Sequence, residues 1–109
     1  VYEAFDTDKR RAVALKVLNE QHAEDETFRE RFLRESHAAA ILQEPHVIPI
    51  HDWGEIDHTL YIDMRLVQGE TLADILAKRA LPVDRAVEII GQVAAALDAA
   101  HANGLIHRD

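Results

Sequence analysis

Cysteine is absent from this 109-residue sequence. Its absence excludes a disulfide framework, a thiolate zinc site and a cysteine nucleophile, and it fits a reducing compartment. Long apolar runs are also absent, because no stretch approaches the roughly 20 residues that a membrane helix needs. The opening residues 1–5 do not have the basic and apolar pattern of a signal peptide.

Positive charge is scarce, with 12 Lys and Arg against 20 Asp and Glu and a formal net charge of −8. A nucleic-acid partner needs a clustered positive surface, so we expect none. The seven histidines form neither an H-x₃-H pair nor an H-E-x-x-H motif, and we expect no metal site within this chain.

The pattern of apolar residues predicts the element order strand, strand, helix, strand, strand, helix, helix. The predicted strands span residues 1–5, 11–18, 47–53 and 59–67. The predicted helices span residues 26–42, 71–79 and 82–103, with Asp25 as the first N-cap and Gly104 at the last C-terminus. A four-stranded antiparallel sheet with one helix, followed by a helical part, indicates an α+β fold with two subdomains.

Two charged residues interrupt the hydrophobic pattern. Glu35 occupies the central position of an apolar stripe on the first predicted helix, formed by Phe28, Phe32, Ala39 and Leu42. Lys16 lies between Ala14 and Leu18 on one face of the second predicted strand. Because burying either charge alone is costly, we predict an ion pair between Lys16 and Glu35. The alternative is that Lys16 reaches solvent from an edge strand and Glu35 lies at the rim of the stripe.

Four segments in this order resemble the protein kinase family. Residues 13–16 (VALK) are similar to the V-A-I-K strand, and Glu35 follows on a predicted helix, at the place of the family's C-helix glutamate. Residues 61–67 (YIDMRLV) resemble the fifth strand, the gatekeeper and the hinge, and residues 107–109 (HRD) resemble the start of the catalytic loop. The segments 31–35, 44–47 and 61–66 are similar to bacterial, especially actinobacterial, receptor-type Ser/Thr kinases.

The resemblance implies a catalytic role for four residues. Lys16 would hold the α- and β-phosphates of ATP, and Glu35 would hold Lys16. Asp109 would accept and orient the hydroxyl of the substrate. Arg108 would pair with a phosphate on the activation loop. His107 would have a structural role.

The resemblance also implies a binding site for the adenine of ATP. Val1 and Ala14 would form its apolar roof, and Met64 would be the gatekeeper. The carbonyl of Arg65 and the N–H of Val67 would pair with the adenine edge. Glutamate is common in the family at the place of Arg65, but only the backbone of that residue would be used.

The implied fold is a truncated protein kinase domain. Residues 1–67 would form the N-lobe through the hinge, without the first strand and the Gly-rich loop. Residues 68–109 would form the start of the C-lobe, with helices D and E and the beginning of the catalytic loop. Neither end of the chain resembles a natural terminus, so we expect a piece of a longer protein. The ligands that hold Mg²⁺ directly would lie outside this chain.

The function that the resemblance implies is transfer of the ATP γ-phosphate to a protein hydroxyl, as in a Ser/Thr protein kinase. We expect the 109 residues alone to be inactive. The implied location is cytoplasmic, and the resemblance allows a homodimer through the N-lobe and a membrane anchor outside this segment. The alternatives are a pseudokinase or regulatory binding module with the kinase fold, a small-molecule phosphotransferase, and an α+β domain unrelated to kinases.

Overall fold

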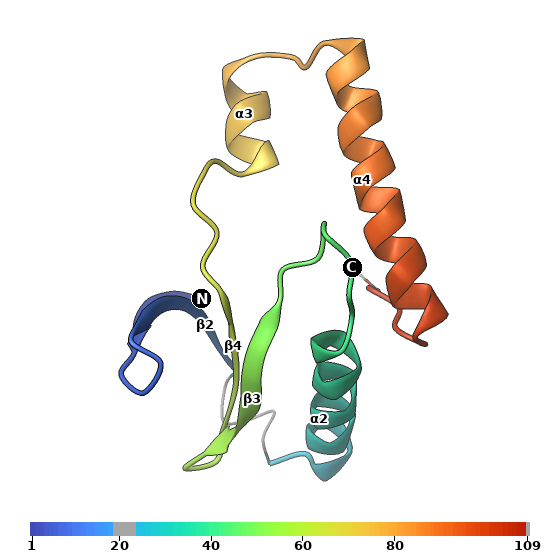
Figure 1. Ribbon diagram of the computed structural model, residues 1–109. Helices are drawn as coiled ribbons and strands as arrows, with labels where there is room; N and C mark the ends of the chain where they lie inside the picture. The colour runs from blue at the N-terminus through green and yellow to red at the C-terminus, as the bar shows by residue number, and fades with distance from the viewer. Residues whose placement is uncertain (19–23, 109) are drawn as a thin grey trace.

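The fold is a four-stranded antiparallel sheet with one helix against it, followed by two further helices (Figure 1). The computed structural model describes residues 1–18 and 24–108. The strands are β1 (Tyr2–Asp6), β2 (Arg11–Leu18), β3 (Ile50–Ile56) and β4 (Thr59–Arg65). The helices are α2 (Glu26–Ala40), α3 (Leu72–Lys78) and α4 (Val83–Ala102). The predicted α+β class and the predicted element order are both confirmed.

The strand order in the sheet is β1-β2-β4-β3, so that β2 is an interior strand. The alternative prediction, that Lys16 reaches solvent from an edge strand, is therefore wrong about the edge strand, although the Lys16 side chain is exposed. Each strand pairs with its neighbours in antiparallel register. Because successive side chains of a strand point to opposite faces, the register puts Ala14 and Lys16 on one face of the sheet and Val13 and Leu15 on the other. We call these the inner face and the outer face, and α2 lies against the inner face.

The largest error of the sequence-based boundaries concerns β3. It was predicted to end at Trp53, with a turn from Gly54 to His58, but it starts at Ile50 and continues through Ile56. The turn consists instead of Asp57 and His58, whose φ angles are +49° and +63°. Two consecutive positive φ angles are typical of the tight hairpin turn whose twist matches that of the strands. The predicted turn was too long because Gly54 and Glu55 resemble turn residues in the sequence. In the structure both residues belong to β3 and pair with β4.

The helix ends follow the local chemistry of the sequence. The Asp25 carboxylate accepts hydrogen bonds from the N–H groups of Thr27 and Phe28 at 3.0 and 3.2 Å, as expected of an N-cap. α2 ends at Ala40 rather than Leu42. α4 begins after Pro82, and Gly104 has φ +76° just beyond its C-cap, where the left-handed conformation favours glycine.

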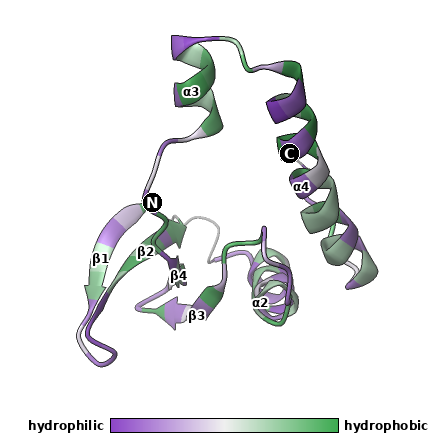
Figure 2. Ribbon diagram, turned by 45° about the horizontal axis from the view of Figure 1, so that its top comes forward, coloured by the Kyte–Doolittle hydropathy of each residue, from purple (hydrophilic) through white to green (hydrophobic). Residues whose placement is uncertain are grey.

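Beyond the extended segment that follows β4, α3 stands apart from the sheet, while α4 returns so that its C-terminal end lies toward α2 (Figure 1). Figure 2 shows hydrophobic and hydrophilic residues alternating along α4. The apolar side chains that α4 leaves exposed are Val83, Val87, Ile90 and Val93. In the described part of the chain, no helix combines the length and the hydrophobicity of a membrane span.

The hydrophobic core is small. Among the described residues, its buried members are Val13, which is 3% exposed, and Leu60, which is 0% exposed. Leu60 lies on β4 directly opposite Leu18 of β2 and Glu55 of β3. The side chain of Leu60 therefore joins the central strands under α2.

Replacing Leu60 by alanine is expected to lower the free energy of unfolding by roughly 2–5 kcal/mol, because a buried leucine is replaced by a cavity. The measurement is a urea titration of the chain, followed by the fluorescence of Trp53, its single tryptophan. The control is Ile56→Ala on β3, where the side chain is 63% exposed and little change is expected. Equal losses in the two variants would contradict the assignment of Leu60 to the core.

Candidate functional site

The register between β2 and β4 positions the first candidate residues. Ala14 is paired directly with Met64, and Lys16 is paired with Ile62. Residues paired across an antiparallel ladder point to the same face, so Ala14, Lys16 and Met64 all belong to the inner face. The side chain of Lys16 is exposed, and no ion pair joins its ammonium group to any of the described residues.

A cavity of about 340 Å³ lies between the inner face, α2 and the C-terminal end of α4. It is lined by residues that are distant in the sequence, among them Lys16, Phe32, Glu35, Leu97 and His107. Three of the predicted stripe residues, Phe32, Glu35 and Ala39, line this cavity on the side of α2. The helix phase inferred from the sequence is therefore correct for these three positions.

Glu35 has a different partner from the one predicted. Its Oε1 atom accepts a hydrogen bond from Nη2 of Arg108 at 3.3 Å. Lys16 and Glu35 line the same cavity, but no ion pair within 4.0 Å joins them. The predicted Lys16–Glu35 ion pair is thus not formed in this structure, and the carboxylate contacts the guanidinium group of Arg108 instead. The sequence pattern did not suggest Arg108 as a competitor.

Arg108 is presented by the segment that follows α4. The N–H groups of Gly104 and Leu105 donate to the carbonyls of His101 and Ala100 at 3.0 and 2.9 Å, which closes the helix end. The chain then extends past Ile106, and Arg108 has φ +62°. Left-handed backbone is uncommon for a side chain of this kind and is often found at functional sites. Asp109, the predicted catalytic residue, lies outside the described residues.

The residues predicted to hold adenine are not gathered in the cavity of Lys16 and Glu35. Ala14 and Met64 face each other across the two central strands, as described. Val1 precedes β1 and is 81% exposed. Arg65 ends β4, where its N–H donates to the carbonyl of Pro49 at 3.0 Å, and Val67 is exposed in the segment beyond. The carbonyl of Arg65 and the N–H of Val67 thus belong to the connection between the sheet and α3.

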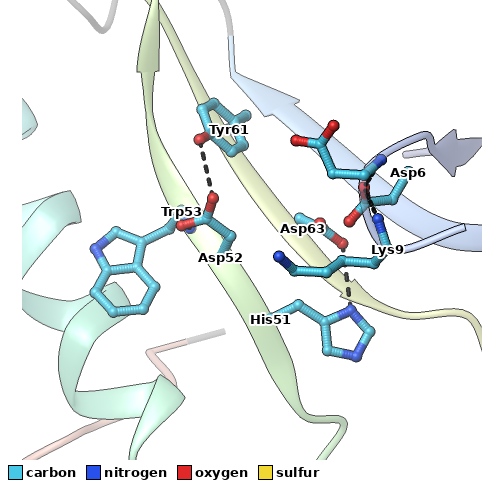
Figure 3. A network of polar contacts seen from close by, with 8 residues as sticks. Asp6, Lys9, His51, Asp52, Trp53, Tyr61 and Asp63 are labelled. Carbon is cyan, nitrogen blue, oxygen red and sulfur yellow. Dashed lines mark hydrogen bonds and ion pairs between the residues drawn. The ribbon is translucent and has the colours of Figure 1, made fainter. Parts of the chain in front are cut away.

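A polar network on the outer face was not found by sequence reasoning (Figure 3). His51 Nδ1 lies 3.4 Å from Asp63 Oδ1, and both atoms are buried without a hydrogen bond of good geometry. The hydroxyl of Tyr61 donates to Asp52 Oδ2 at 3.4 Å. Burial, first of all, and the nearby Asp52 carboxylate raise the pKa of Tyr61 above its usual value. His51 and Asp52 lie on β3, and Tyr61 and Asp63 lie on β4. These four residues could be grouped only once the pairing of the two strands was known.

Within the described part of the chain, no group of three or more histidine and carboxylate side chains could hold a metal ion.

Comparison with known proteins gives one consistent family. The family model described as the protein kinase domain matches residues 1–109. The chain is 54% identical to the serine/threonine-protein kinase PknE of Mycobacterium tuberculosis, over all of this chain and 19% of the relative. It is 50% identical to PknD of the same organism, over all of this chain and 17% of the relative. The chain therefore spans about a fifth of the length of the curated relatives that it matches.

A solved structure supports the same family at the level of the fold. The crystal structure of the Mycobacterium tuberculosis PknI kinase domain superposes with a TM-score of 0.81 and 44% sequence identity. The match covers 91% of this chain and 42% of that chain. The sheet, α2 and the following helices thus correspond to the N-lobe and the start of the C-lobe of a kinase domain.

Replacing Arg108 by methionine is expected to change the free energy of unfolding by less than about 1 kcal/mol, because exposed ion pairs contribute little. The side chains of Arg108 and Glu35 are 56% and 41% exposed. Urea titration of the chain measures the change, with Leu60→Ala as the destabilised reference. A loss as large as that of Leu60→Ala would show that the Arg108–Glu35 contact is essential to the fold.

The raised pKa of Tyr61 predicts that its phenol ionises above pH 10.0, the ordinary value. The measurement is an ultraviolet titration of a Tyr2→Phe variant, in which Tyr61 is the single tyrosine. Adding Asp52→Asn removes the neighbouring negative charge and is expected to lower the midpoint. A midpoint at or below 10.0, unchanged by Asp52→Asn, would contradict the contact.

Proposed function

Because this chain belongs to the protein kinase domain family, we propose that it forms the N-lobe and the start of the C-lobe of an ATP-dependent serine/threonine protein kinase. The remainder of the catalytic domain would be supplied by a longer chain, which we call the parent kinase. The observation that carries the proposal is the convergence of Lys16, Glu35 and His107 at one cavity from three separate parts of the sequence, with Arg108 in contact with Glu35.

The inner face fits the binding of ATP. Ala14 and Met64 are paired residues and offer an apolar surface to the adenine ring. Beyond β4, the carbonyl of Arg65 and the N–H of Val67 offer the acceptor and donor that pair with its edge. Val1, at the start of β1, would complete the apolar roof. The ammonium group of Lys16 lies on the same face, without a charged partner among the described residues, and is available for phosphate oxygens.

The chemical work of these residues is positioning and charge stabilisation. When bound, ATP supplies the phosphoryl group that is transferred, and Mg²⁺ neutralises its developing charge. Lys16 holds the α- and β-phosphates, and Glu35 holds Lys16 in place. Asp109 accepts and orients the hydroxyl of the protein substrate. The residues that hold Mg²⁺ belong to the remainder of the parent kinase.

The observed contact of Glu35 with Arg108 defines an arrangement in which Lys16 lacks its partner. Before phosphoryl transfer, Glu35 would exchange Arg108 for Lys16. Arg108 would then be free to pair with a phosphate on the activation loop. Both exchanges involve exposed side chains, so neither has to overcome the cost of breaking a buried ion pair.

The assignment of serine and threonine as acceptors is supported by the names of PknE and PknD. The proposed location of this segment is the cytoplasm, with any membrane anchor of the parent outside these residues. A homodimer through the N-lobe would use the outer face, where a groove of about 430 Å³ is lined by Phe5, Val17 and Ile56 among others.

Replacing Lys16 by methionine in the parent kinase is expected to reduce phosphate transfer from radiolabelled ATP to a protein substrate at least 100-fold, because the phosphates lose their positioning charge. The control is Lys9→Met, which removes the same charge from the turn between β1 and β2. The 109-residue chain alone is expected to be inactive in the same assay, because it lacks the residues that hold Mg²⁺.

Two outcomes would contradict the proposed enzymatic function. Wild-type parent kinase that binds ATP but transfers no phosphate would favour a pseudokinase or regulatory binding module. Equal activities of wild-type protein and Lys16→Met would show that Lys16 is not the phosphate-binding lysine.

A further inference from the structure

The helix that carries Glu35 is attached to the sheet through β3. Near its N-terminus, Nε of Arg29 donates to Oε2 of Glu55. Near its C-terminus, the ring of His37 lies edge-on to Trp53, with ring centroids 5.7 Å apart and an interplanar angle of 63°. Trp53 and Glu55 are two residues apart on β3 and therefore point to the same side of the strand. Two contacts, near the two ends of the helix, thus join α2 to β3.

The Arg29–Glu55 contact is the charged one of the two attachments. The side chain of Glu55 is 20% exposed and that of Arg29 is 39% exposed, so solvent screens the pair only in part. The hydrogen bond that Arg29 donates to Glu55, first of all, raises the pKa of Arg29, and the carboxylates of Glu26 and Glu30 act in the same direction. His58 Nδ1, at 3.9 Å, is the other basic group near Glu55. Removing Arg29 would therefore leave a half-buried carboxylate with one distant partner.

Glu35 lies between the two attachment points in the helix. Its carboxylate contacts Arg108, and the same cavity is lined by Lys16. Because α2 is a rigid element, a small rotation about its axis moves this carboxylate relative to both cations. The contacts on β3 therefore determine how closely Glu35 can approach Lys16.

We infer that Arg29 and Glu55 are positioning residues for phosphoryl transfer, acting through Glu35. The inference rests on the proposed function, since it assumes that the Lys16–Glu35 pair is required for activity. Neither residue lines the cavity, and neither is expected to touch ATP or the protein substrate. Their effect is to hold the helix at a rotation in which Glu35 faces the cavity that Lys16 also lines.

The test is a set of variants of the parent kinase. Arg29→Met and Glu55→Gln are each expected to lower kcat about 5–20-fold, with the KM for the protein substrate unchanged within twofold. The double variant is expected to lose no more than either single variant, because the two residues act as one pair. The matched control is Arg34→Met, which removes the same charge from an exposed position of α2 and is expected to leave kcat unchanged.

A second comparison separates positioning from a general loss of structure. In a Glu35→Gln background, Arg29→Met is expected to cause no further loss of kcat, because the carboxylate that Arg29 positions has already been removed. A further loss there, or a fall of the thermal midpoint that accounts for the loss of activity, would assign Arg29 and Glu55 a merely structural role and overturn the inference.

The failure of the inference and the failure of the proposed function give different results. If wild-type protein is active and Lys16→Met is inactive, but Arg29→Met matches the wild type, the inference alone is wrong. If wild-type protein transfers no phosphate, or Lys16→Met is fully active, the proposed function is wrong and the inference falls with it.

Discussion

The pairing of β2 with β4 is the constraint on which the rest of the structure depends. It brings Ala14 opposite Met64 and puts Lys16 on the face that α2 covers. A slip of one residue would turn Lys16 to the outer face and Val13 to the inner face, since side chains alternate along a strand. The same register buries Val13 on the outer face and Leu60 on the inner face, the two hydrophobic side chains that the described part of the chain buries. One strand pairing thus places both the buried side chains and the candidate phosphate-binding lysine.

The site combines this sheet with a helix whose Glu35 lines the same cavity as Lys16. Glu35 contacts Arg108, while no carboxylate among the described residues forms an ion pair with Lys16. In the proposed function, Glu35 pairs either with Arg108 or with Lys16. Such an exchange is suited to a switch, because exposed ion pairs contribute little and the free energies of the two arrangements therefore differ by little.

Sequence reasoning predicted the fold class, the order of the elements and the phase of Phe32, Glu35 and Ala39 on α2. These features follow from periodicity and from local capping, which short segments encode by themselves. It misplaced β3, because Gly54 and Glu55 resemble turn residues, and their pairing with Tyr61 and Leu60 is a tertiary property. It also missed Arg108 as the partner of Glu35, since no local pattern relates residues that lie 73 positions apart. Sequence reasoning missed the Arg29–Glu55 contact for the same reason, because these two residues are also distant in the sequence.

The extended segment after β4 divides the described structure into a sheet half and a helical half (Figure 1). Among the described residues, the Arg108–Glu35 contact is the one hydrogen bond or ion pair that joins the two halves. Mobile ions weaken such an exposed contact over a Debye length of about 8 Å at physiological ionic strength. The apolar walls of the shared cavity are not weakened in this way. The polar contact between the two halves is therefore expected to weaken as the ionic strength of the medium rises, while the apolar lining of the cavity they share is left unchanged.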